Sequence, residues 1–197
     1  MLGLVIATLF SYFRFRPHVM RSLPTTWFVI ALLSTVTISP AAELVTLTPQ
    51  NFDRYAPSGK EVDRIYGDFV LRNDHITVVI ARPVAGRHAN MTVRNTGGAV
   101  IDLTSTKQPN DQLSAYYPGG KTMDWRSVEV VPIDGANPGV TDPTKAHVKA
   151  EEVSLTCKAE GGKGFPEAEV QYTLSDSWSY LHIETIYRNR TEKTIEF

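Results

Sequence analysis

The clearest sign of how this chain folds is Val170-Gln171-Tyr172-Thr173-Leu174, followed by Leu181-His182-Ile183-Glu184-Thr185-Ile186-Tyr187-Arg188. In both stretches apolar or aromatic side chains largely alternate with polar ones. Because successive side chains of a strand point to opposite faces of a sheet, this period of two predicts half-buried strands. The intervening Ser175-Asp176-Ser177 is typical of a turn, so we expect it to join two consecutive strands.

Turn residues separate other runs of the same kind. Arg72-Asn73-Asp74-His75 lies between Phe69–Leu71 and Ile76–Ala81, an arrangement that predicts a β-hairpin. The pair Gly97-Gly98 precedes a predicted strand over Ala99–Leu103. After the first apolar segments, no long stretch has the 3.6-residue period of a helix. Many short strands with regular turns predict an all-β fold, either an antiparallel β-sandwich or an open barrel.

The chain opens with the features of a secretory signal peptide. Its first 41 residues hold three arginines, no acidic residue and two apolar runs, 2–13 and 27–38, before a small-residue exit at Ser39-Pro40-Ala41. Each run has about 12 residues, whereas a helix needs roughly 20 to cross a bilayer. We therefore expect cleavage before Ala42, with Met20 as an alternative start.

The expected organisation is a signal peptide over residues 1–41 and a β-sandwich domain over residues 42–197. Such a domain is expected to be secreted or periplasmic, with no membrane partner after cleavage. The alternative is an uncleaved N-terminal anchor, which would also leave the domain outside. The final Thr194-Ile195-Glu196-Phe197 reads as part of a strand, and natural sheets rarely end on such an apolar edge. We therefore expect the domain to be the front part of a longer protein, with a truncated reading frame as the alternative.

The composition limits the classes of partner. Of the 197 residues, 42% are apolar and 21% are charged, which is typical of a globular chain. The formal net charge is −1, and the body is slightly acidic because the leader carries only basic charges, so we expect no nucleic-acid partner. Cys157 is the only cysteine, so no disulfide can form within the chain. It shares a predicted strand face with Val153 and Leu155, which indicates a buried, unreactive thiol.

The sequence contains no recognisable catalytic or metal-binding motif. The histidines of the body are too widely spaced to form a local pair of metal ligands; they are His75, His88, His147 and His182. There is no G-x-S-x-G, no dinucleotide fingerprint and no phosphate-binding loop. We therefore expect no cofactor and no metal, while a metal site assembled from distant strands stays open.

Two segments combine the residue types that bind carbohydrate, namely aromatic faces and planar polar groups. One spans Asp111–Trp125, largely within the predicted loop Thr104–Asp124, and the other follows Pro83; long segments without regular structure are often functional. If the two face one groove, the ligand-binding residues are Arg87, His88, Asn90, Asp111, Tyr116, Tyr117 and Trp125. The alternative is that Tyr116 and Tyr117 cover the core beneath the loop. A further segment that does not fit a strand is Asp134–Thr144.

Three passages carry a resemblance. The sequence reads YGDFVLRND at residues 66–74, NTGGAVIDL at 95–103 and DQLSAYYPGG at 111–120. These passages resemble the N-terminal β-rich region of large secreted bacterial proteins that have a PHP-type metallohydrolase domain further downstream. The resemblance implies that the metal-binding histidines of such a hydrolase lie in that later domain, so no catalytic residue is assigned to this chain.

A second likeness concerns architecture. Residues 170–174 and 184–189 resemble strands of galactose-mutarotase-like sandwiches, which favours the sandwich. The segment Gly86-Arg87-His88-Ala89-Asn90 is similar to one in aldose epimerases, but there it follows the Gly-Gly strand and here it precedes Gly97-Gly98. Our hypothesis is an exported, non-catalytic β-sandwich module that binds carbohydrate or assists a downstream hydrolase domain. The alternatives are a mutarotase-type sugar epimerase and a structural cell-envelope protein without ligand.

Overall fold

The computed structural model describes residues 41–58, 63–89, 93–110, 113, 115–132, 142–162 and 164–196. Contacts divide the chain into a unit of residues 1–37 and a unit of residues 38–197, and all described residues belong to the second unit. Outside the described residues lie the expected signal peptide up to residue 40, the candidates Asn90 and Asp111, and most of the 134–144 segment.

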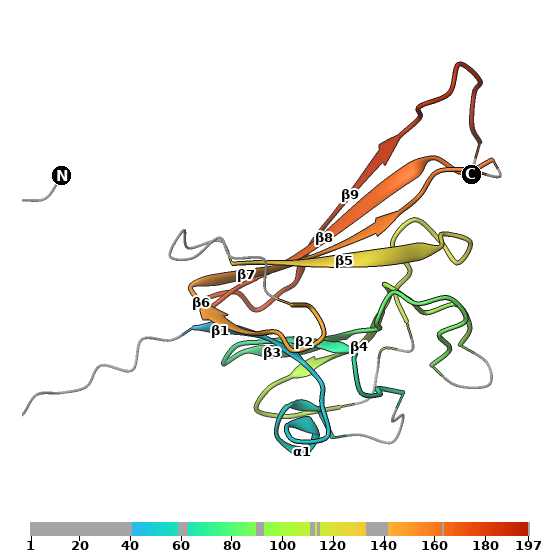
Figure 1. Ribbon diagram of the computed structural model, residues 1–197. Helices are drawn as coiled ribbons and strands as arrows, with labels where there is room; N and C mark the ends of the chain where they lie inside the picture. The colour runs from blue at the N-terminus through green and yellow to red at the C-terminus, as the bar shows by residue number, and fades with distance from the viewer. Residues whose placement is uncertain are drawn as a thin grey trace, which may run out of the picture. The chain divides into compact units, whose positions relative to one another are not determined.

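Two antiparallel sheets face each other across a shared core, which confirms the all-β sandwich (Figure 1). The first sheet has the order β4-β3-β2-β1-β6, with strands β1 (Ala42–Thr46), β2 (Phe69–Arg72), β3 (Ile76–Ile80), β4 (Val100–Ser105) and β6 (His147–Ala150). The second sheet has the order β5-β7-β8-β9, with strands β5 (Trp125–Pro132), β7 (Glu152–Ala159), β8 (Glu167–Ser175) and β9 (His182–Arg188).

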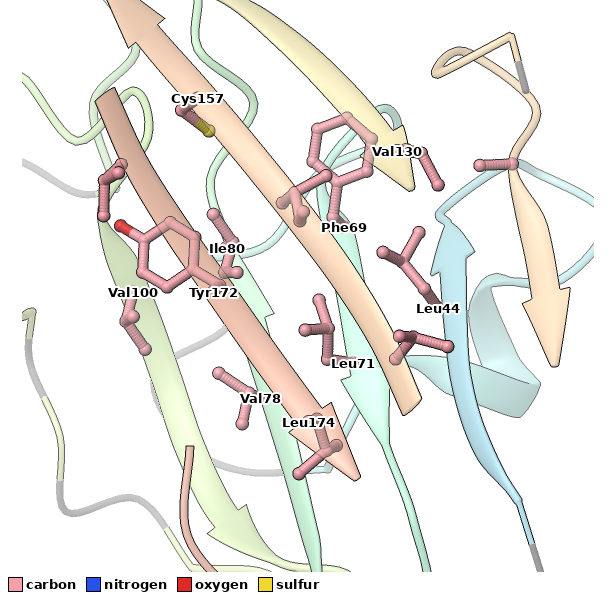
Figure 2. Close-up of a cluster of buried hydrophobic side chains, with 14 of the residues drawn as sticks. Leu44, Phe69, Leu71, Val78, Ile80, Val100, Val130, Cys157, Tyr172 and Leu174 are labelled. Carbon is pink, nitrogen blue, oxygen red and sulfur yellow. The ribbon is translucent and has the colours of Figure 1, made fainter. Parts of the chain in front are cut away.

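The period of two determines what the second sheet buries. Along β8 the side chains of Ala168, Val170, Tyr172 and Leu174 are buried, while Glu169 and Gln171, which alternate with the first three, are partly exposed. β7 lies antiparallel to β8 and presents Leu155 and Cys157 to the same core. Cys157 is therefore a buried member of the core, as the alternation predicted. Figure 2 shows Cys157, Tyr172 and Leu174 pointing toward side chains of the first sheet.

The central strands of the first sheet, β1, β2 and β3, are largely buried on both faces. One face, which includes Leu44 and Leu71, packs against the second sheet, while Val45 and Val70 belong to a second cluster with Tyr55. Tyr55 ends the short helix α1 (Phe52–Tyr55), which lies on the side of this sheet away from β7 and β8 (Figure 1).

Burial on both faces of β3 differs from the half-buried strand that the sequence predicts. The alternation in β3 predicted a half-buried strand, but Thr77 and Val79 are buried along with Val78 and Ile80. Strands with both faces covered read as nearly continuous apolar runs, and Phe69-Val70-Leu71 in β2 follows that rule. The predicted hairpin between β2 and β3 is confirmed, with Phe69 opposite Ile80.

Among the described residues, no helix has the length and apolar character needed to span a membrane.

Candidate functional site

Arg87, a candidate ligand residue, is almost completely buried at 6% exposure. Its Nη2 donates to Oδ2 of Asp68 at 2.7 Å and to the backbone oxygen of Asp63 at 2.6 Å. Its Nη1 donates to the backbone oxygen of His88. These contacts are all within the protein, so Arg87 serves to hold its loop against the end of β2.

The other candidates of this part of the chain are dispersed. His88 is exposed, and its Nδ1 accepts a hydrogen bond from the backbone N–H of Asn95 at 3.1 Å. Trp125 is only 3% exposed and belongs to the main core. The Tyr117 hydroxyl donates to the backbone oxygen of Arg94 at 2.8 Å. Asn90 and Asp111 lie outside the described residues.

The two candidate segments do meet at a groove of about 400 Å³. Val84–Gly86, Asn95 and Gly97 line one side, and Lys121–Trp125 line the other, with Phe165 completing the wall. Trp125 is the one sequence candidate among these lining residues, and its indole is almost wholly covered. The polar side chains of this groove are those of Asn95, Lys121, Thr122 and Asp124, none of which is a candidate from the sequence.

Tyr116 lies in a different groove, which we call the tyrosine groove. It is about 550 Å³ in volume and is lined by Ile76, Val100, Leu103, Thr104, Ser105, Asn110, Leu113, Tyr116, Ser179, Tyr180, Leu181 and Ile183. These residues come from β3, β4, the segment after β4, and the start of β9. Because β4 and β9 are edge strands of the two sheets, the groove runs between the two edges.

Backbone hydrogen bonds hold Tyr116 at the rim of the tyrosine groove. Its N–H donates to the oxygen of Val100 at 2.8 Å, and the N–H of Val100 donates back to Tyr116 at 3.1 Å. The side chain remains 47% exposed. Tyr116 therefore does not seal the core, which was the alternative reading of this residue.

Tyr180 supplies the second aromatic ring of the tyrosine groove, with 55% of the residue exposed. Its ring stacks on Trp178, with centroids 4.9 Å apart and planes inclined by 13°. Both residues lie in the connection between β8 and β9, where the sequence predicts only the turn Ser175-Asp176-Ser177. The available signal was the presence of two aromatic residues within a short polar turn.

Asn73 fixes the position of that connection. Its Oδ1 accepts hydrogen bonds from the backbone N–H groups of His75 and Ile76 at 2.8 and 2.9 Å. Its Nδ2 donates to the oxygens of Ser175 and Trp178, each at 2.7 Å. One buried amide thus joins the β2–β3 hairpin of the first sheet to the β8–β9 connection of the second.

The electrostatics of the tyrosine groove are those of an uncharged site. None of its lining residues in the described part of the chain is Asp, Glu, Lys, Arg or His. Burial raises the pKa of the nearby Tyr187 above its ordinary value, and the neighbouring Tyr116 adds to that rise. In the described part of the chain there is no cluster of potential metal ligands.

The described histidines also lack carboxylate partners among the described residues. His147 Nε2 lies 3.4 Å from the hydroxyl of Tyr55, and His182 packs edge-on against Trp178. What the arrangement offers chemically is therefore two aromatic surfaces and hydrogen-bonding groups for an uncharged ligand.

Comparisons with family models, curated proteins and solved structures give no match to this chain.

Proposed function

We propose that the sandwich is a non-catalytic carbohydrate-binding module of an exported protein, and that the tyrosine groove is its binding site. The observation that carries the proposal is the presence of two tyrosines, each about half exposed, in one groove. The chain brings Tyr116 and Tyr180 together from the edges of different sheets. Exposed aromatic residues gathered in one hollow indicate a ligand with flat apolar faces.

The chemistry of the lining fits a sugar. The C–H faces of a pyranose ring pack on aromatic rings, and its hydroxyls need hydrogen-bonding partners at the rim. Ser105 and Asn110 supply a hydroxyl and an amide group to the lining, whereas Thr104 is 4% exposed and its Oγ1 accepts a hydrogen bond from the N–H of Asn110. A volume of about 550 Å³ is within the range of sites that hold small ligands.

The charge of the lining narrows the class of sugar. Binding a uronate or a sulfated sugar requires a cation to compensate for the desolvated anion. No described residue in the lining of the tyrosine groove has a cationic side chain. We therefore assign neutral polysaccharides or oligosaccharides as the ligands.

Export is the second part of the proposal. β1 begins at Ala42, the residue that follows the expected cleavage position. Removal of the leader at that position leaves every strand of the sandwich in place. A module of this kind assists a hydrolase domain further along the same protein by keeping that domain close to its polymer.

A mutarotase-type epimerase requires a histidine and a carboxylate that act together on the sugar. Three of the four described histidines, His147, His88 and His182, instead contact a tyrosine, a backbone N–H and an aromatic ring. No specific observation favours this alternative over binding.

The binding experiment is a titration of the exported protein with a panel of neutral and acidic glycans. Tyr116→Ala and Tyr180→Ala should each weaken the binding of a neutral glycan about tenfold, which corresponds to roughly 1.4 kcal/mol of lost aromatic contact. Tyr66→Ala is the matched control, since Tyr66 is 57% exposed but does not line the groove. If no neutral glycan binds, or if Tyr66→Ala is as harmful as the groove variants, the site assignment is wrong.

Export is tested by expressing the full chain in a bacterial host. The product outside the cytoplasm should begin at Ala42, as read by N-terminal sequencing. Recovery of the intact chain from the cytosol would contradict the export proposal and would leave the binding result unaffected.

A further inference from the structure

Each sheet of the sandwich has two edge strands, and three of the four edges are protected. Tyr116 pairs with Val100 and covers part of β4. β6 has only four residues and includes Lys149. β5 has a register irregularity between Trp125 and Ser127 and ends at Pro132. Short strands, lysines, prolines and bulges are the features with which sheets avoid pairing at their edges.

β9 has none of these features. It has seven residues, His182–Arg188, without Pro, Gly or Lys. Its pairing with β8 runs from Glu167 opposite Arg188 to Thr173 opposite His182 without an irregularity. Ile186 and Tyr187 are exposed by 38% and 39%. A long, regular edge with exposed apolar side chains is a surface that another strand can extend.

We propose that β9 pairs in antiparallel orientation with β9 of a second copy of this chain, centred on Ile186. In this register Ile186 lies opposite the partner's Ile186, and Glu184 lies opposite the partner's Arg188. Two-fold symmetry repeats the ion pair on the other side of the centre. The second sheets of the two copies then form one continuous sheet.

Charge complementarity selects this register. A pairing centred on Glu184 places two carboxylates opposite each other, and a pairing centred on Arg188 places two guanidinium groups opposite each other. Like charges in directly opposite positions destabilise a strand pair. Pairings centred on Thr185 or Tyr187 place a charged side chain opposite Ile186. Among these pairings, only the one centred on Ile186 places Glu184 opposite the partner's Arg188 and Ile186 opposite the partner's Ile186.

The surroundings of Arg188 leave room for this contact. Its Nη1 lies 3.4 Å from Oε2 of Glu169 on β8, and its side chain is 41% exposed. A guanidinium group has five N–H donors, so it can bind Glu169 on one side and the partner's Glu184 on the other. Across the inner face, Thr185 meets the partner's Tyr187, a favourable pair of a β-branched and an aromatic residue.

Disulfide trapping tests the register in the full chain. In Ile186→Cys the two introduced thiols face each other, with Cα atoms about 4.5 or 5.5 Å apart, which a disulfide can bridge. In the matched control, His182→Cys, the thiols lie about 26 Å apart along the pair. The native Cys157 is buried and does not interfere. We expect a dimer on non-reducing gels for Ile186→Cys and a monomer for His182→Cys.

Charge exchange and mass measurement complete the test. In a Glu169→Gln background, which removes the carboxylate beside Arg188, Arg188→Glu and Glu184→Arg should each raise the dimer dissociation constant at least tenfold in light scattering, and the double variant Glu184→Arg with Arg188→Glu should restore it. Circular dichroism shows whether each variant is folded. The proposal is overturned by a wild-type chain that stays monomeric at high concentration, by equal trapping at residues 182 and 186, or by a folded double variant that remains monomeric.

Discussion

The guanidinium of Arg87 and the carboxylate of Asp68 form a buried ion pair at the end of β2, with Nη2 and Oδ2 2.7 Å apart. The side chains are 4% and 0% exposed. The carboxylate of Asp68 also accepts hydrogen bonds from the backbone N–H groups of Ile65 and Arg82, at 2.8 and 2.9 Å. This pair therefore ties two loop segments to the first sheet without leaving a charge unsatisfied.

Removing one partner of this pair should be far more harmful than removing an exposed charge. Arg87→Met leaves the Asp68 carboxylate buried without its cation, and such losses cost about 3–5 kcal/mol of unfolding free energy. Arg126→Met is the control, because Arg126 and its partner Asp124 have side chains that are 53% and 55% exposed. Exposed pairs contribute at most about 1 kcal/mol. Urea denaturation of both variants measures the difference, and equal midpoints would refute this role for Arg87.

Arg87 also illustrates what the sequence could and could not predict. The local cluster of Arg87 and His88 suggested a polar binding surface, but a local pattern does not reveal a carboxylate 19 residues away. The alternation of side chains did predict the strands, because it depends only on neighbouring residues. It could not predict that Val79 of β3 belongs to a second buried cluster with Tyr55 of α1.

The tyrosine groove shows the same division. Tyr116 was identified from a local aromatic cluster, whereas Tyr180 lies far along the chain and reaches the groove only through the strand order. Trp125 was grouped with Tyr116 because the two are close in sequence. The strand β5 instead turns Trp125 into the core, which no local pattern distinguishes from an exposed aromatic residue.

Asn73 offers a test of how the two sheets are joined. Asn73→Ala removes four hydrogen bonds, two to the hairpin turn and two to the β8–β9 connection. Leaving buried backbone groups without partners should cost about 2–3 kcal/mol of unfolding free energy. The Asn73 amide donates to the backbone oxygens of Ser175 and Trp178 and so holds the connection that contains Tyr180. Its loss should therefore displace Tyr180 and also weaken glycan binding. Thermal unfolding and the glycan titration measure the two effects.

Asp74→Ala is the matched control for Asn73, since Asp74 is an exposed neighbour in the same turn. It should leave both the melting temperature and the affinity nearly unchanged. A loss of stability in Asp74→Ala comparable to that in Asn73→Ala would mean that the turn, and not the amide, is what matters.

Gly98 is expected to tolerate no side chain. Its φ is +75°, and a Cβ there would lie 2.7 Å from Cγ of Trp125. The carbonyl of Gly98 also accepts the hydrogen bond of the Tyr172 hydroxyl, so neither the glycine nor the indole can shift freely. Gly98→Ala should lower the unfolding free energy by about 2–4 kcal/mol, from overpacking together with backbone strain.

Gly86→Ala separates strain from overpacking. Gly86 has a similar φ of +71°, but nothing lies within 4 Å of its added Cβ. Gly86→Ala should lower the unfolding free energy by about 1 kcal/mol, which is the cost of placing a non-glycine residue in the left-handed region. Denaturation curves followed by tryptophan fluorescence compare the two, and similar losses would show that contact with Trp125 is unimportant.

The buried thiol of Cys157 should make the stability of the fold depend on pH in the alkaline range. Burial raises its pKa from 9.0 to about 12, so the folded chain keeps the proton while the unfolded chain releases it above pH 9. The unfolded state then binds fewer protons, and the unfolding free energy falls as pH rises from about 9 toward 12, by at most roughly 1.4 kcal/mol per pH unit. Burial also raises the pKa of Tyr172, which adds its own alkaline loss. Subtracting the curve of Cys157→Ala from that of the wild type isolates the thiol, because the substitution changes packing equally at every pH.

A thiol reagent should label Cys157 at pH 8 only after denaturant is added, and rapid labelling of the native chain would show that the thiol is accessible.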